Sequence, residues 1–250
     1  MLTIAAVLLV AVLVGSVFQR ISGLGLGLVG GPVLTFMVGP VAGITMVNGL
    51  SIINAANNAW AVRRKTDWGR FRLLAGGLLI GSLPALLVVH FFSGPWLLIM
   101  IGVLVLLALA VASFQPDQAR LSSEAKLPMV LAGLVGGFMS TIAGIAGPAL
   151  TVYARLTGWN HRDFIATLHP VLLVANTLSF LLKVVFIGGL DFGAVPGWLW
   201  LIAIIAIFAG AWIGDAVNRH VSNIWARRLA NLLAAAGALS VLVRGIMELV

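Results

Sequence analysis

Cysteine is absent from this chain of 250 residues, and charged residues make up only 9% of it. Without cysteine there is no disulfide scaffold, thiol nucleophile, iron–sulfur cluster or Cys-ligated zinc site. The four histidines lie in four different stretches: His90, His161, His169 and His220. They form no H-E-x-x-H motif of the kind that binds zinc. We therefore expect no metal site, no cofactor and no catalytic residue.

The scarcity of charge accompanies a very apolar composition. Hydrophobic residues make up 61% of the chain, and its mean hydropathy is +1.13. In a water-soluble domain, roughly 25% of residues are charged. A single soluble core of this size could not bury so many apolar side chains, and much of their surface would remain exposed to water. The composition predicts an all-α polytopic membrane protein that contacts the lipid bilayer.

A helix needs about 20 apolar residues to cross a bilayer. Eight stretches qualify: Leu2–Phe18, Ile44–Val62, Phe71–Phe92, Trp96–Phe114, Leu127–Ala143, Phe164–Ile187, Trp198–Ala216 and Leu229–Leu249. Two more, Leu24–Val41 and Pro148–Leu156, are short or are interrupted by glycine and proline. We expect eight full helices and two broken or re-entrant ones, and the sequence leaves open whether those two cross fully.

The two halves of the chain resemble each other. Gly31–Thr35 recurs as Gly147–Thr151, and Asp67-Trp68-Gly69 is echoed by Asp191-Phe192-Gly193 after a long apolar stretch. The polar segment Gln115–Lys126 lies between the two copies. We predict a first membrane repeat over residues 1–114, a cytoplasmic linker over 115–126 and a second membrane repeat over 127–250.

Basic residues indicate how the two repeats sit in the membrane. With five crossings per half and the N-terminus outside, only Lys183 and Arg244 fall on the outer side. Four crossings per half would place either the Arg63–Arg72 cluster or the Arg219–Arg228 cluster outside. The positive-inside rule therefore predicts two inverted repeats in a bacterial-type inner membrane, with both termini outside. Since the net charge of +8 reflects this topology, we expect no nucleic-acid partner.

Three segments carry a resemblance to a known family. Ile21–Thr35 (ISGLGLGLVGGPVLT), its shorter copy Ile142–Thr151 (IAGIAGPALT) and Asp67-Trp68 after an arginine-rich turn are similar to the TauE/SafE-type sulfite exporter family. The resemblance covers essentially the whole chain. It implies a small duplicated membrane transporter, and not an enzyme, for sulfite, an organosulfonate or a related small anion.

Broken helices offer such a protein a place for its anion. Irregular backbone at membrane depth is tolerated where it lines a cavity, and a helix beginning there presents free N–H groups. Because the interruptions are paired between the halves, we predict that they bind the substrate. The residues are Gly30, Gly31, Pro32, Gly147 and Pro148, with Thr151 as an additional candidate. Close packing of helices at small residues is the alternative.

Polar residues follow helical spacing in two apolar stretches. Ile44–Val62 carries Asn48, Ser51, Asn54, Asn57 and Asn58, whereas Phe164–Ile187 carries His169, Asn176 and Lys183 at intervals of seven. We predict a shared hydrated cavity in which Asn54, Asn57, His169 and Asn176 contact the substrate, with Asn48 and Ser51 as further candidates. The alternative is interhelical hydrogen bonding, worth about 0.6 kcal/mol per bond.

Two titratable groups have more than one interpretation. His169 precedes Pro170 inside an apolar stretch; it could donate to an anion, carry a coupling proton, or bond a backbone carbonyl that the proline frees. Gln19 and Arg20 precede the first glycine segment. Arg20 supplies a fixed positive charge there or extends to the membrane interface.

The seven acidic residues all map to loops or segment ends, so we expect neither a carboxylate proton relay nor a carboxylate cation site. We predict an anion exporter that works by alternating access. The alternatives are a metabolite exporter of the ten-helix inverted-repeat type and a membrane hydrolase using Ser140 with His169, which would lack a G-x-S-x-G motif. The sequence leaves open which anion is carried, the direction of transport, the coupling ion and whether the chain forms a homodimer.

Overall fold

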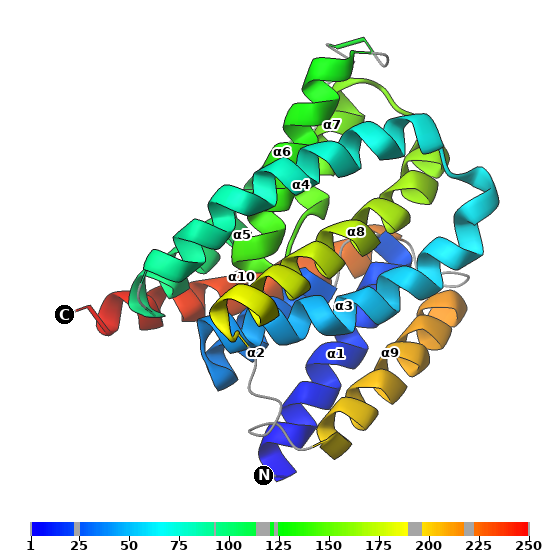
Figure 1. Cartoon of the computed structure of the whole chain (residues 1–250). Coiled ribbons are helices and arrows are strands. Elements are labelled where there is room, and N and C mark those ends of the chain that lie inside the picture. Colours follow the sequence, from blue (N-terminus) through cyan, green and yellow to red (C-terminus); the bar gives the residue numbers. More distant parts are fainter. Residues whose placement is uncertain are drawn as a thin grey trace.

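The computed structural model describes residues 2–22, 26–92, 94–113, 121–122, 125–189, 197–217 and 223–249. These residues are almost entirely helical (Figure 1). In chain order the elements are α1 (Leu2–Ser22), the π-helical turn η1 (Leu26–Gly30), α2 (Gly31–Val38), α3 (Pro40–Val62), the 3₁₀ turn η2 (Arg63–Lys65), α4 (Trp68–Phe91), α5 (Gly94–Ser113), α6 (Lys126–Ala143), α7 (Gly147–Leu156), α8 (His161–Ile187), α9 (Gly197–Val217) and α10 (Asn223–Met247).

The described residues of the eight predicted stretches are almost entirely helical, and so are those of the two interrupted ones. The largest boundary difference is at α10, which begins at Asn223, six residues ahead of the predicted start at Leu229. Arg227 and Arg228 therefore lie within a helix and not in a loop. Arginine is a good helix former whose long side chain can reach out of an apolar layer, so a basic pair does not end a membrane helix.

Length and composition make the described helices suitable for a bilayer. Helices α4, α5, α6, α8 and α9 are long and apolar enough to span it, and residues 6–21, 26–38 and 231–247 form shorter apolar segments. Large apolar side chains such as Leu79, Ile80 and Trp212 cover the outside of the bundle. The prediction of an all-α polytopic membrane protein is confirmed.

Helix packing repeats between the two halves of the chain. Helix α4 packs on α6 in the same way that its counterpart α9 packs on α1, and α3–α8 and α5–α10 form two further pairs (Figure 1). Glycine permits both intimate contacts: a Cβ on Gly81 would lie 1.9 Å from the Leu134 carbonyl oxygen, and one on Gly210 would lie 2.7 Å from that of Leu13. Each of these contacts therefore joins a helix of one half to a helix of the other.

Long-range hydrogen bonds show which helix ends lie together. At one end, which we call the Arg20 end, Arg20 near the end of α1 bonds Asp215 near the end of α9 and Asn58 near the end of α3. At the other, the Arg244 end, Arg244 of α10 donates from Nη1 to the Phe36 carbonyl oxygen near the end of α2. Helices α3 and α8 run antiparallel, because the Thr66 hydroxyl, just after α3, donates to the Ala166 carbonyl near the start of α8.

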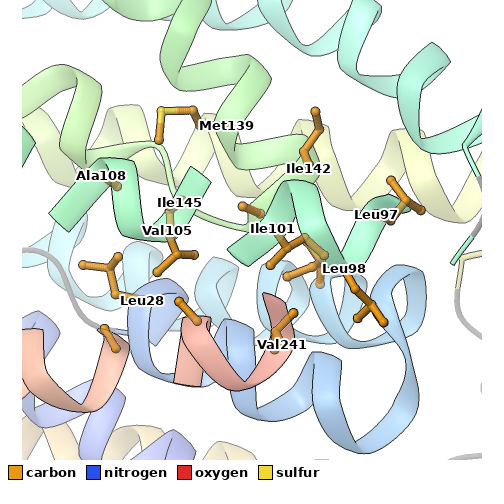
Figure 2. Close-up of a cluster of buried hydrophobic side chains, with 14 of the residues drawn as sticks. Leu28, Leu97, Leu98, Ile101, Val105, Ala108, Met139, Ile142, Ile145 and Val241 are labelled. Atoms are coloured by element: carbon orange, nitrogen blue, oxygen red, sulfur yellow. The ribbon is translucent and has the colours of Figure 1, made fainter. Parts of the chain in front are cut away.

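An apolar core encloses the two interrupted segments. Figure 2 shows Leu28 of η1 and Ile142 and Ile145, which flank the end of α6, gathered around Ile101 and Val105 of α5. Such packing excludes lipid from the irregular backbone, as membrane depth requires.

Candidate functional site

The two interruptions meet in the middle of the molecule. Helix α6 ends at Gly144, which has a left-handed φ of +72° that favours glycine. Gly27 of η1 lies against it: a Cβ built on Gly27 would be 2.2 Å from the Gly144 carbonyl oxygen. Only a glycine at position 27 allows this approach without a shift of the backbone.

A small cavity lined by both polar and apolar groups lies at this meeting point. Its volume is about 30 Å³, and it is lined by Gln19, Gly27, Leu28, Ser51, Gly144, Ile145, Ala146, Gly147, Pro148, Leu172 and Asn176. A cavity of this volume holds about two water molecules. Five predicted site residues therefore line one cavity: Gln19, Ser51, Gly147, Pro148 and Asn176.

The start of α7 faces this cavity. Its N-cap residue Ala146 makes no side-chain hydrogen bond to the helix, and Pro148 follows within the first turn. The first N–H groups of a helix have no partner inside the helix and mark the positive end of its dipole. Thr151, one turn further on, donates its hydroxyl to the Gly147 carbonyl oxygen within the same helix.

The interruption in the first half differs from the predicted break at Gly30–Pro32. The π-turn η1 runs directly into α2, so Gly30, Gly31 and Pro32 lie inside a continuous helical segment that begins at Leu26. They do not line the cavity; a Cβ on Gly31 would contact the Ala143 carbonyl oxygen, and Pro32 lies against Gly237 of α10. Proline cannot donate to the turn before it, and a wider π-turn accommodates that loss.

Most of the polar residues of α3 and α8 are buried. Asn48, Ser51, Asn54 and Asn58 are buried, whereas Asn57 is half-buried and does not line the cavity. On α8, His169, Asn176 and Lys183 are all buried. Asn176 donates from Nδ2 to the Leu172 carbonyl oxygen. Neither Nδ1 of His169 nor Nδ2 of Asn54 has a hydrogen-bond partner among the described residues.

Toward the Arg20 end, the polar residues form a linked chain. The guanidinium of Arg20 donates to both carboxylate oxygens of Asp215, at 2.6 and 2.9 Å, and through Nη1 to Oδ1 of Asn58 at 2.6 Å. Asn58 in turn donates to Oδ1 of Asn54 at 3.2 Å. Arg20 of α1 is thus held by hydrogen bonds to α3 and α9. Neither sequence interpretation of Arg20 predicted these partners. Gln19 accepts from the first N–H of η1, at Leu26.

A second polar chain runs toward the Arg244 end. Sequence reasoning named Asn48 as a further site candidate but did not assign the other members of this chain to the substrate site. Asn48 donates to the Ser140 carbonyl oxygen. The Ser140 and Ser179 hydroxyls are 3.1 Å apart, Ser179 and Thr141 3.0 Å, and Lys183 donates from Nζ to the Thr141 carbonyl oxygen at 3.0 Å. Ser179 and Lys183 are four residues apart and therefore neighbours on one face of α8. This spacing is the sequence signal that could have identified the second chain.

One internal register relates the two chains. Ser51 and Asn176, Asn54 and Ser179, and Asn58 and Lys183 are each 125 positions apart. The first pair lies at the cavity, whereas the other two lie progressively further from it on opposite sides. We call the whole set, from Arg20 through the cavity to Lys183, the polar column.

The family model described as sulfite exporter TauE/SafE matches residues 7–241, nearly the whole chain. The chain belongs to the TauE/SafE family. Membership makes it a membrane transporter of small anions such as sulfite and not an enzyme, so the hydrolase alternative is set aside. Accordingly, the Ser140 hydroxyl takes part in the hydrogen bonds of the polar column. No curated protein and no solved structure matches this TauE/SafE chain.

Proposed function

We propose that this TauE/SafE protein exports sulfite or a small organosulfonate by alternating access between two inverted repeats. The observation that carries the proposal is the contact of both interruptions at one cavity, to which α3 and α8 contribute Ser51 and Asn176. Paired breaks at a repeat interface are typical of secondary-transporter sites.

The substrate would occupy an enlarged form of this cavity. The uncapped start of α7 supplies N–H groups and a positive dipole end. Ser51 and Asn176, related by the internal register, supply a hydroxyl and an amide from the two sides. An anion there is bound by neutral donors, so binding does not trap it as a fixed ion pair would.

The packing pattern supports the rocking of one repeat against the other. Each half supplies one helix to the α4–α6 contact and one to the α9–α1 contact, so a motion that loosens one contact can tighten the other. For an anion leaving a cell with an inside-negative potential, about 2.3 kcal/mol per charge is gained at 100 mV. Export of this kind needs no buried carboxylate.

An uptake panel in proteoliposomes tests this function. Sulfite, an organosulfonate such as sulfoacetate, taurine, sulfate and a carboxylate are compared at one internal potential. We expect saturable movement of sulfite or the organosulfonate at rates well above empty liposomes. Equal rates for the carboxylate would point to a general metabolite exporter, and no movement of any sulfur oxyanion would contradict the proposal.

A further inference from the structure

Lys183 is a buried cation with no counter-charge in the part of the chain that the structure describes. Only 1% of its surface is exposed, and it is among the largest fully buried side chains. The ion pairs recorded for the described residues join Arg20 to Asp215, Arg70 to Asp67 and Arg244 to Glu248. Burying an ammonium group without a partner costs several kcal/mol, and a bound anion would offset that cost.

The surroundings of Lys183 are hydroxyl groups and one carbonyl. Its Nζ donates to the Thr141 carbonyl oxygen, and the Thr141 and Ser179 hydroxyls bond each other next to it. An ammonium group has three donors, and this bond uses one. The carbonyl belongs to the last turn of α6, where a lysine can cap the helix. Capping satisfies a carbonyl but leaves the positive charge without a counter-ion.

The position of Lys183 mirrors that of Arg20. The register of 125 pairs Lys183 with Asn58, and Asn58 is the residue that holds Arg20. Each end of the polar column therefore has one cation, supplied by α1 at one end and by α8 at the other. Arg20 has Asp215 as a partner, whereas Lys183 has none among the described residues.

Lys183 is also connected to the cavity. Its neighbour Ser179 bonds Ser140, whose carbonyl accepts from Asn48. Oδ1 of Asn48 lies 3.4 Å from the ideal Cβ position of Gly144, which lines the cavity. An anion that leaves the cavity toward the Arg244 end therefore meets amide and hydroxyl groups and then the ammonium group.

We propose that Lys183 is the cationic contact for the transported oxyanion at the Arg244 end of the polar column, with Thr141 and Ser179 supplying hydroxyl contacts. The mobile anion is then the counter-charge that the protein lacks. The inference rests on the proposed function, because it takes a small sulfur oxyanion as the substrate.

The experiment compares variants reconstituted in proteoliposomes, with sulfite as the probe. Lys183→Met removes the charge and keeps the length, Lys183→Gln keeps a donor, and Lys183→Arg keeps the charge. Lys126→Met removes one positive charge at the exposed start of α6 and serves as the matched control. Asp191, the acid nearest to Lys183 in sequence, lies outside the described residues, so Asp191→Asn tests it as a hidden partner. KM, kcat and Tm are measured for each.

We expect the two neutral variants to raise the KM for sulfite at least tenfold, Lys183→Arg to keep it within about threefold, and Lys126→Met and Asp191→Asn to leave it within twofold. A lowered Tm with an unchanged KM would assign Lys183 to capping and overturn the proposal. So would an Asp191→Asn variant that reproduces Lys183→Met. Wild-type protein that moves no sulfite would contradict the proposed function instead.

Should neither neutral variant fold, selenite bound to the wild-type protein decides the question. Density that places a selenite oxygen within hydrogen-bond distance of the Lys183 Nζ supports the proposal. Density confined to the cavity at Ser51 and Asn176 overturns it.

Discussion

Ser51 of α3 and Asn176 of α8 line the cavity, together with Gln19 of α1. Replacing Ser51 or Asn176 by alanine removes a hydrogen-bonding group from a water-poor site, which typically costs about 1–3 kcal/mol of binding. We expect Ser51→Ala and Asn176→Ala to raise the substrate KM about tenfold while the folded protein still reaches the membrane. Asn57→Ala is the matched control, because Asn57 is half-buried on the same helix and does not line the cavity. Equal effects at Asn57 and Asn176 would show that the cavity is not the binding site.

His169 is buried beside Pro170, and its Nδ1 has no partner among the described residues. An imidazole titrates near neutral pH when unperturbed, whereas glutamine cannot titrate. We expect His169→Gln to flatten the pH dependence of transport more than it lowers the maximum rate. The measurement uses a sulfonate of constant charge, since sulfite itself titrates. An unchanged profile would leave membrane potential or the substrate gradient as the driving force.

The asparagines of α3 show how far helical spacing predicts a site. Steps of three residues fall about 60° short of a full turn, so by Asn57 a run that starts at Asn48 has rotated to the opposite face. Asn58 lies within about 40° of both Ser51 and Asn54 around the helix, and it holds Arg20. Spacing identified the helix and its polar side, and a count of about 100° per residue separates the two adjacent asparagines that the prediction had placed on one face.

The contact between η1 and the end of α6 depends on one glycine. A Cβ on Gly27 would overlap the Gly144 carbonyl, which is backbone and cannot rotate away. We expect Gly27→Ala to destabilise the fold by about 1–3 kcal/mol, as overpacking does, and to lower transport. Gly76→Ala in α4 is the matched control, since nothing lies within 4 Å of that position; it should be neutral or stabilising. A Gly27→Ala protein with wild-type Tm and transport would contradict the contact.

Helices α1 and α9 are joined by the bidentate Arg20–Asp215 pair. The pair is partly exposed, so we expect Asp215→Asn to cost about 1 kcal/mol. The double variant Arg20→Asp, Asp215→Arg should recover much of that stability, measured as Tm. It should not recover transport, because Arg20 also holds Asn58 of the polar column. Recovery of both would make the pair a purely structural link.

Hydropathy located every described helix, because a bilayer sets both the length and the composition of its spans. It could not place the first interruption. Gly30–Pro32 looks like a helix start, yet η1 precedes it and the segment begins at Leu26. Whether a proline begins a helix or sits within one depends on the neighbouring turn, and here that turn is set by packing against α6.

Across the whole molecule, charge separates the two ends. The Arg20 end gathers the basic residues of η2 and of the neighbouring starts and ends of helices: Arg20, Arg63, Arg64, Lys65, Arg70, Arg72, Arg155 and Arg162. At the Arg244 end, the described residues include Arg244, paired with Glu248, and the buried Lys183. From the positive-inside rule we predict that the more basic end lies in the cytoplasm and, with five crossings per half, that both termini lie outside.

Single cysteines test this orientation cleanly, because the natural chain has none. Arg64→Cys lies in η2 at the Arg20 end, and Met247→Cys lies at the end of α10 on a side chain that is 73% exposed. We expect an impermeant maleimide to label Met247→Cys in intact cells and Arg64→Cys only after permeabilisation. Labelling of both in intact cells would place the two ends on one side of the membrane and exclude the inverted five-plus-five arrangement. The reverse pattern would keep the inverted repeats but turn the transporter over, so that the anion would leave the cell past Arg20 and enter the polar column at Lys183.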